Sequence, residues 1–463
     1  MERAFREWLA QKLSSGPKLL SLAIALRVVV FAFLAPVDND FGHLEVIQYI
    51  VQHRALPPVT ENSSAFHPPL YHLLAAAFYE VTGTAKGAQF LSLVLSILTL
   101  LVLYRLLYKE NLIQGEQSRL YAFMLVCFLP QFVLYGLYVS NDTLANFMGA
   151  AIILQVARVA SVPTAWQFAL LGVVVGVALL TKATFLAFLP VLFAFVLFIS
   201  LRRGQSRPKS VLAAFVFLFL ACGLGSYKFV RNYIEVKNPF VSNLDLGFSW
   251  VAEQKESYRG AASYYDANLL KLVASPSLSP ATEGAYPLLL YGTFWYQHIP
   301  ESNLLGSRRA PFNYLGSAIY VLALVPTAIF FYGLLILLKR LPRFLGGFDP
   351  SLEECRRLLV SYVAVFCFLG NLALIGDVVL KYHVWSVMQG RLLFPSFTGM
   401  LVPFGVGIAA TANYRFAHAA LRWAMGALIC CFGAYFASEI AYQVLVHFVP
   451  GVKEFLKRFS FQS

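Results

Sequence analysis

Four ionisable side chains stand within eight residues, directly after the first apolar run of the chain. They are Asp38, Asp40, His43 and Glu45, and they follow the run "LLSLAIALRVVVFAFLA". A carboxylate at a water interface can act as a general base, and carboxylates with histidines can bind a divalent metal ion. A carboxylate that caps the next helix would explain one aspartate, but it explains the cluster poorly.

Two histidines close the same polar segment, in "FHPPLYH". With Asp40 or Glu45 as an oxygen ligand, His67 and His72 raise a divalent metal ion as a candidate cofactor. No ligand spacing here is diagnostic of a metal site. The two prolines also predict the start of a helix, with His67 as a polar residue just before it. On the residues alone, the helix start is the favoured interpretation.

Basic side chains at the ends of later apolar runs are candidates for binding an anion. The candidates are Lys182, Lys228, Arg231 and Arg391. Interfacial anchoring is the alternative interpretation, but charges that border hydrocarbon are costly and tend to be functional. In "VSNDT", Asn141 and Asp142 stand at another predicted helix end, where they face a cavity or cap the helix.

A membrane protein must position these side chains. The chain has 463 residues, of which 59% are hydrophobic and 13% charged, and its mean hydropathy is +0.67. Apolar runs recur at roughly 18 to 25 residues, the length at which a helix crosses a bilayer. The alternating pattern of barrel strands is absent, so we predict an all-α polytopic membrane protein.

The apolar runs predict about 11 transmembrane helices in one integral domain over residues 1–463. We expect them near Leu19–Val37, Lys86–Tyr108, Arg119–Ser140, Thr143–Val159, Trp166–Thr181, Ala183–Leu201, Val211–Val230, Tyr314–Leu338, Leu358–Leu380, Leu392–Ala412 and Leu421–Val446. The segment His67–Gly83 is apolar but too short to span comfortably, so we interpret it as interfacial or re-entrant.

Charge in the loops predicts the orientation. If His67–Gly83 does not cross, the basic loops fall together on the side of the basic N-terminus, which the positive-inside rule places in the cytoplasm. Two long polar segments, 38–85 and 231–313, then lie outside the cytoplasm. The formal charge of +13 does not indicate nucleic-acid binding, because the basic residues are spread over short loops.

Several stretches, taken in order, resemble the membrane glycosyltransferases of the GT-C fold, with the protein O-mannosyltransferases and the lipid A aminoarabinose transferases as the nearest branches. They are "DNDFGHLEVIQYIVQHRALP", "HPPLYHLLAAAFY", "LYVSNDTLANFMGAAIILQVA", "GVVVGVALLTKATFLAFLPVLF", "SYKFVRNYIEVKNPF" and "MQGRLLFPSF". The resemblance covers most of the chain from Pro36 to about Phe404, and the order of the stretches carries it.

The resemblance implies transfer of a sugar from a polyprenyl-phosphate carrier to a lipid, protein or glycan acceptor at the extracytoplasmic face. It implies an aspartate in the first external loop as catalytic base, and some members of the family also use a metal. Where the family usually has an adjacent Asp-Glu pair, Asn39 separates Asp38 from Asp40 here. We favour Asp40, because Asp40, His43 and Ile47 have helical spacing, and Asp38 remains the other candidate.

The resemblance gives the four basic residues the role of binding the donor phosphate, for which their charge is suited. We expect an integral protein of a bacterial inner membrane with a cytoplasmic N-terminus. A transporter or flippase of a lipid-linked sugar is the alternative function, since many spans around a polar cavity would also serve it. The sugar, the acceptor and the oligomeric state stay open.

Overall fold

The computed structural model is helical throughout the residues that it describes, which are 16–36, 38, 42–202, 206–296, 298–299, 312–349, 351–412 and 414–448. Nine of its helical segments are long and apolar enough to cross a membrane. The protein is therefore an integral membrane protein with multiple spans, which confirms the predicted all-α polytopic class.

The nine spans correspond one by one to predicted spans. They are α2 (Gly16–Phe33), α5 with the turn after it (Ala85–Lys109), α8 (Asn141–Ser161), α10 with the turn before it (Ala183–Arg202), α11 (Arg207–Gly225), α17 and α18 (Tyr314–Gly346), α19 (Glu353–Tyr382), α20 with the turns before it (Trp385–Thr411) and α21 (Arg415–Val444). Two predicted spans differ. α9 (Ala165–Leu179) has only 15 residues, and the predicted Arg119–Ser140 span is broken into α6 (Glu116–Phe128) and α7 (Pro130–Leu134).

The break between α6 and α7 follows from Pro130, and a buried arginine compensates for it. Proline has no backbone N–H, so the carbonyl of Val126 loses its donor four residues later. The guanidinium of Arg27, which is fully buried on α2, donates to the carbonyls of Val126 at 3.0 Å and Cys127 at 3.1 Å. It also donates to Ser96 at 2.9 Å. Arg27 therefore satisfies backbone groups that lipid or apolar side chains could not.

We expect Arg27→Met to lower the stability of the folded protein by about 2 kcal/mol, because it leaves two buried carbonyls unpaired while removing a buried charge. A thermal melt of the protein in detergent measures this. Lys18→Met, at an exposed position of the same helix, is the control. An equal melting temperature for the two variants would mean that Arg27 does not hold the α6–α7 break together.

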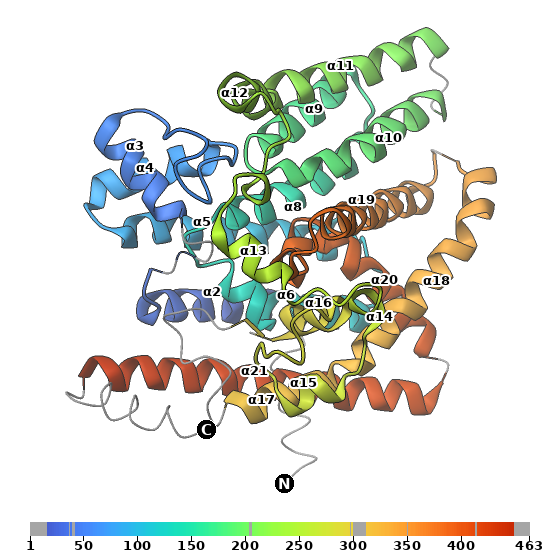
Figure 1. The fold of residues 1–463 in the computed structure, drawn as a ribbon. Helices are drawn as coiled ribbons and strands as arrows, with labels where there is room; N and C mark the ends of the chain where they lie inside the picture. The colour runs from blue at the N-terminus through green and yellow to red at the C-terminus, as the bar shows by residue number, and fades with distance from the viewer. Residues whose placement is uncertain are drawn as a thin grey trace.

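The polar helices gather at one end of the spans. The first polar segment forms α3 (His43–His53) and α4 (Leu70–Thr82), and the second forms α12 (Tyr227–Val236), α13 (Ser249–Lys255), α14 (Ala262–Tyr265), α15 (Leu270–Ala274) and α16 (Tyr286–Trp295). In Figure 1, α3 and α4 lie at the left, whereas the C-terminal ends of α10 and α18 lie at the right. The 13 residues of α4 are too few to cross a bilayer, as predicted for His67–Gly83.

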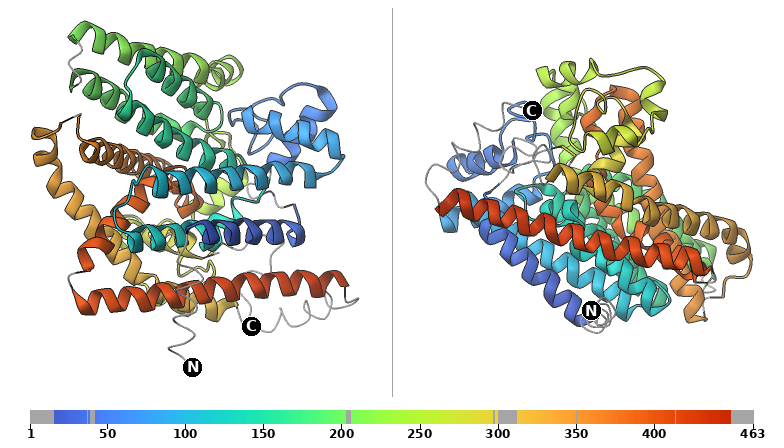
Figure 2. Two further views of the ribbon diagram at one scale, coloured as in Figure 1. Left: turned by 180° about the vertical axis from the view of Figure 1, so that it is seen from behind. Right: turned by 90° about the horizontal axis from the view of Figure 1, so that it is seen from below.

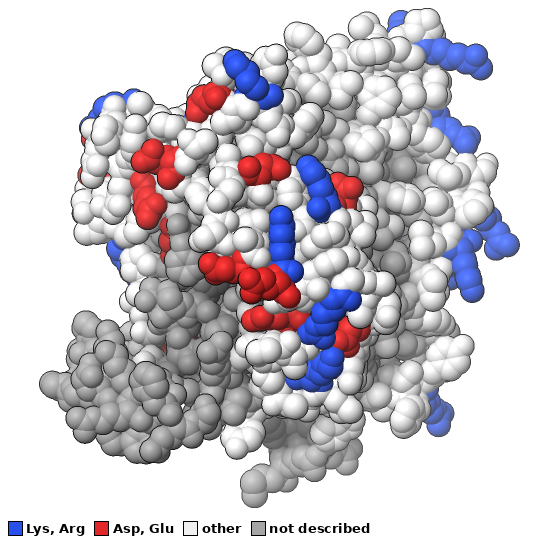
Figure 3. Space-filling view, viewed as in Figure 1, with Lys and Arg blue, Asp and Glu red and all other residues white. Residues whose placement is uncertain are grey.

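The four short basic loops meet at the opposite end. The turn between α5 and α6 and the connection between α20 and α21 lie on the same side as the ends of α10 and α18 (Figure 2). The edge at the right of Figure 3 carries Lys and Arg side chains, and no acidic side chain is visible along it in this view. This is the charge distribution on which the predicted topology depends.

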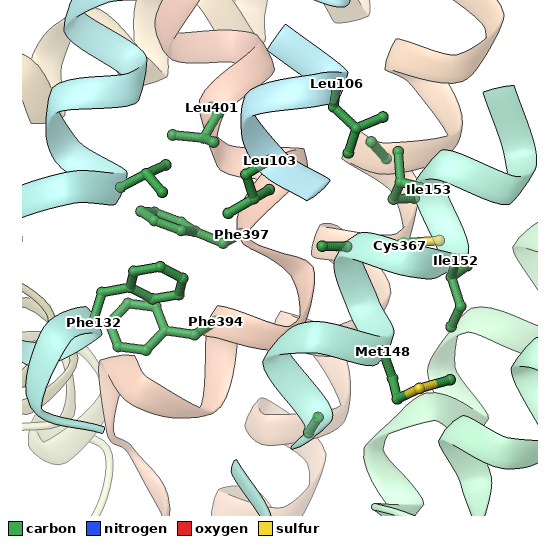
Figure 4. Packing of buried hydrophobic residues seen from close by; sticks show 14 of the residues in the cluster. Leu103, Leu106, Phe132, Met148, Ile152, Ile153, Cys367, Phe394, Phe397 and Leu401 are labelled. Atoms are coloured by element: carbon green, nitrogen blue, oxygen red, sulfur yellow. The ribbon is translucent and has the colours of Figure 1, made fainter. Parts of the chain in front are cut away.

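Aromatic rings pack directly beneath the polar end. Phe132 of α7 contacts Phe394 at a ring-centroid distance of 5.1 Å and Phe397 at 4.8 Å (Figure 4). Phe394 belongs to a tight 3-10 segment, Gly390–Ser396, that leads into α20 (Phe397–Thr411). This packing fixes the 390–396 segment against α7.

Candidate functional site

A buried carboxylate bound by two cations lies where α8 begins. Ser140 caps the helix, since its hydroxyl accepts the backbone N–H of Asp142 at 3.2 Å. The Asp142 side chain is 2% exposed, and it forms ion pairs with Lys182 and, at 2.9 Å, with Arg391. Charges buried to this degree are stable only when paired. The cluster carries two cations for one anion.

Three separate elements bring these charges together. Asp142 stands in the first turn of α8, Lys182 follows α9, and Arg391 lies in the 390–396 segment after α19. α8 and this segment touch through their backbones, because a Cβ atom placed on Gly149 would lie 1.7 Å from the carbonyl oxygen of Pro395. Only glycine permits that approach, which fixes Arg391 beside the start of α8.

Further contacts hold the guanidinium of Arg391. Its Nε donates to the side-chain oxygen of Gln389 at 2.8 Å, and its plane lies 4.9 Å from the centroid of the Tyr135 ring. Neither partner was singled out by sequence reasoning, although Gln389 stands two residues before Arg391 in the motif "MQGR". A planar cation held in this way is oriented for an anion such as a phosphate.

An apolar cavity of about 470 Å³ is lined in part by Leu393, from the 390–396 segment that also carries Arg391. Its walls come from α16, α18, α19 and α20 and include Phe294, Phe330, Leu372, Leu393 and Phe397. The 390–396 segment thus contributes Leu393 to the cavity wall and Arg391 to the ion cluster, although Asp142, Lys182 and Arg391 do not themselves line the cavity. The backbone N–H of Gly390 donates to Thr293, next to Phe294, at 2.7 Å. A site with a cationic head and an apolar wall suits an amphipathic anion.

In the first polar segment, Asp38 binds the start of α3. Its Oδ2 accepts the backbone N–H groups of Gly42 at 3.0 Å and Leu44 at 2.7 Å. Asp38 thus has the capping contact that was the alternative explanation for one aspartate of the cluster. Asp40 lies outside the described residues, and α3 begins at His43, so Asp40 precedes the helix.

The predicted histidines form one group, in which His43 and His72 are buried and His67 is half-buried. His43 Nδ1 lies 2.9 Å from His72 Nε2, and the ring of His67 stacks on His43 at a centroid distance of 5.5 Å. Burial, and then the charge of His43, holds the pKa of His72 well below its usual value. One imidazole of the pair must donate and the other accept, so the accepting ring is neutral.

Tyr71 connects the first polar segment to the ion cluster, and sequence reasoning missed it. It is fully buried, and its hydroxyl lies 3.1 Å from that of Ser92. Burial raises the pKa of Tyr71, and the charges of Asp38 and Asp142 act in the same direction, so both carboxylates lie within electrostatic reach of the ring. Its place between His67 and His72 in "HPPLYH" was the signal available.

The other two basic candidates lie on α12 and differ in their contacts. Arg231 is bound by the carbonyls of Pro57 and Ala65 and by Glu235 at 2.8 Å, so it fastens the first polar segment to α12. Lys228 is 5% exposed, and its ammonium lies 5.1 Å from the centroid of Phe66. Neither a hydrogen bond nor an ion pair joins Lys228 to any described residue. Burial lowers the pKa of Lys228 to about 8.

The described residues that were raised for a metal ion make other contacts. His43 and His72 bind each other, Glu45 accepts from Asn62 at 3.1 Å, and Asp142 is paired with two cations. Among the described ranges, no group of three or more His, Cys, Asp or Glu side chains could hold a metal. The neighbouring Asn141 is fully buried, and neither of its amide atoms has a hydrogen-bond partner among the residues that the structure describes.

Lys228 predicts a pH dependence for anion binding at this site. Its ammonium is charged below its pKa of about 8, so the affinity for a phosphodiester should fall as the pH rises from about 7 to about 9. Lys228→Arg should keep its affinity over this range, because arginine stays protonated. Lys237→Arg, at an exposed lysine just after the same helix, is the control. Identical pH profiles for wild type and Lys228→Arg would exclude Lys228 from the site.

Residues 66–225 match the family described as dolichyl-phosphate-mannose-protein mannosyltransferase. The segment contains His67, His72, Asp142 and Lys182, and the match confirms the predicted resemblance to GT-C glycosyltransferases. No curated protein matches the chain in sequence.

The solved structures of three membrane enzymes have a backbone fold similar to that of this chain. Oligosaccharyltransferase AglB from Archaeoglobus fulgidus, in complex with an inhibitory peptide and a dolichol-phosphate, is 12% identical, covers 92% of this chain and 55% of its own, and has a TM-score of 0.45. ArnT from Cupriavidus metallidurans, bound to undecaprenyl phosphate, is 16% identical. The match covers 85% of this chain and 78% of ArnT, with a TM-score of 0.38. Arabinosyltransferase EmbB from Mycobacterium smegmatis is 11% identical. The match covers 93% of this chain and 41% of EmbB, with a TM-score of 0.43. The chain spans about half the length of the archaeal enzyme.

Proposed function

We propose that this protein transfers a sugar from a polyprenyl-phosphate carrier to an acceptor at the extracytoplasmic face of the membrane. The observation that carries the proposal is the ion cluster of Asp142, Lys182 and Arg391, which one short segment, 390–396, connects to the wall of an apolar cavity. A polyprenyl phosphate has the same division, because an anionic phosphate is attached to a long apolar tail. The family match over residues 66–225 supports the same donor class.

In this proposal the cations hold the leaving group. Arg391 and Lys182 bind the phosphate, and Lys228 supplies a further cation that has no anionic partner among the described residues. As the bond between the anomeric carbon and the phosphate oxygen breaks, negative charge collects on the phosphate. Fixed cations in a water-poor site stabilise that charge.

Asp40 acts as the general base. The acceptor hydroxyl attacks the anomeric carbon from the face opposite the phosphate, its proton passes to the carboxylate, and the sugar is transferred with inversion. Asp38 is engaged with the start of α3, which favours Asp40 for proton transfer. Asp38 then shapes the short segment in which Asp40 stands. No step of this reaction is assigned to a metal ion.

The charge of the loops supports the orientation. The end with the short basic loops faces the cytoplasm, together with the N-terminus, and the candidate site faces the opposite compartment. In a bacterium this membrane is the inner membrane. Acceptors of three classes, a lipid, a protein or a growing glycan, can approach from that side.

The test is release of polyprenyl phosphate by the purified protein in liposomes. A panel of polyprenyl-phosphate sugars is supplied together with crude membrane acceptor, and the freed carrier is quantified. We expect release with one donor class and none without acceptor. If the carrier-linked sugar instead crosses between leaflets intact and no carrier phosphate is freed, the protein is a flippase and the transferase proposal is wrong.

A further inference from the structure

A second cavity, of about 650 Å³, lies at the opposite end of the spans from the candidate active site. It opens between the C-terminal half of α18, the start of α19 and the end of α20, and the loop 112–114 lines it as well. Its wall is partly apolar, through residues such as Ile336, Leu337, Val402 and Val406. Nothing in the proposed transfer reaction uses it.

Backbone contact between two helices explains why the cavity begins where it does. A Cβ atom on Gly333 would lie 1.9 Å from the carbonyl oxygen of Pro403, and one on Gly407 would lie 2.2 Å from that of Ile329. α18 and α20 are therefore pressed together at this level. Beyond it, Pro342 interrupts the hydrogen-bond ladder inside α18, and residues 336–347 line the open space.

Three arginines line this cavity, against one acidic side chain. Arg340 and Arg343 come from α18 and Arg357 from α19, and Glu354 is the acidic residue. None of the three guanidinium groups has a hydrogen bond or an ion pair with a described residue. A smaller hollow that shares Leu112 and Arg357 adds Lys109 and Arg356, together with Glu110 and Glu353. The larger cavity therefore carries surplus positive charge at the level where spans meet water.

We propose that this cavity binds the phosphate headgroup of an anionic membrane phospholipid. Arginine binds phosphate oxygens through two parallel N–H groups, and basic pockets between membrane helices are suited to such headgroups. The acyl chains would lie along the apolar wall formed by α18 and α20. A soluble anion would match the arginines but not that wall, so a lipid matches the whole lining better.

The test measures how much phospholipid the purified full-length protein retains. The protein is equilibrated with micelles that contain phosphatidylglycerol or phosphatidylcholine, and bound lipid is counted by native mass spectrometry. We expect selective retention of phosphatidylglycerol, and about a tenfold loss in the triple variant Arg340→Gln, Arg343→Gln, Arg357→Gln. The matched control neutralises three exposed basic residues at the same end and outside the cavity, as Arg207→Gln, Lys209→Gln, Arg415→Gln.

Each further outcome decides the proposal. Equal retention by the two triple variants, or equal retention of both lipids by the wild type, would overturn it. Displacement of phosphatidylglycerol by inorganic pyrophosphate at equal concentration would also overturn it, because the site would then take a soluble anion. Should the cavity variant fail to fold, the single variant Arg343→Gln, at an exposed position, is expected to lose retention by severalfold. The readout is lipid mass, so it does not depend on sugar transfer.

Discussion

Replacement of Asp40 by Asn is expected to leave a folded protein that binds the polyprenyl-phosphate donor but transfers sugar at least about 100-fold more slowly. The expectation follows from general-base catalysis, which contributes about 10² to 10⁴ in rate. Asparagine preserves the size and polarity of the side chain and removes its ability to take a proton. Release of polyprenyl phosphate under single-turnover conditions measures the chemical step, and retention of labelled donor measures binding.

Asp38→Asn is the matched variant, and the structure makes it informative. Asn and Asp cap helices about equally well, so the contacts of Asp38 with the N–H groups of Gly42 and Leu44 should survive the change. We therefore expect Asp38→Asn to retain activity within about tenfold, while Asp38→Ala loses stability of about 1 kcal/mol through the missing cap. Loss of transfer in Asp38→Asn with normal turnover in Asp40→Asn would give the role of base to Asp38.

The second large effect concerns the cation Arg391 and the anion Asp142 of the buried ion cluster. We expect Arg391→Ala to weaken binding of polyprenyl phosphate by about 10- to 100-fold, since a hydrogen bond to a charged group contributes about 1.5 to 3 kcal/mol. Asp142→Asn should not weaken it, because that change removes the anion that competes with phosphate for Lys182 and Arg391. Both variants should melt at lower temperature than the wild type, because each leaves buried charge uncompensated.

The difference in donor binding between Arg391→Ala and Asp142→Asn distinguishes a phosphate site from an ion cluster that is only structural. If the cluster only held α8 to the 390–396 segment, both variants would melt lower and both would bind donor equally well. A titration of polyprenyl phosphate, followed by the increase in melting temperature, provides the binding curve. Lys209→Ala, at an exposed lysine of α11 far from the cluster, controls for a general loss of positive charge.

Local properties of the sequence were enough to predict the class of protein. The length of an apolar run and the position of charges at its ends are set by the thickness and polarity of the bilayer. For this reason the nine spans could be placed, with ends that differ from the observed ones by at most 8 residues, and α4 could be identified as too short to cross. The same reasoning singled out Asp142, Lys182 and Arg391 separately, since each is a charge at the border of hydrocarbon.

Two features of the fold depended on tertiary contacts. The predicted Arg119–Ser140 span breaks at Pro130, and Arg27, on another helix, supplies donors to the backbone carbonyls that the break leaves unpaired. The lengths of apolar runs cannot reveal this pairing, because Arg27 and Val126 are 99 residues apart. The role of Asp38 was also open in the sequence, and the position of the N–H groups at the start of α3 made it a cap.

The sequence by itself determined that this is a helical membrane protein, which charges border its spans and which polar segments lie at one end. Only the tertiary structure decided that Asp142 joins Lys182, 40 residues away, to Arg391, 249 residues away. The physical reason is that membrane insertion depends on each segment alone, whereas an ion pair depends on which helices become neighbours. That choice is made by close packing at positions such as Gly149, where a single side chain would keep two backbones apart.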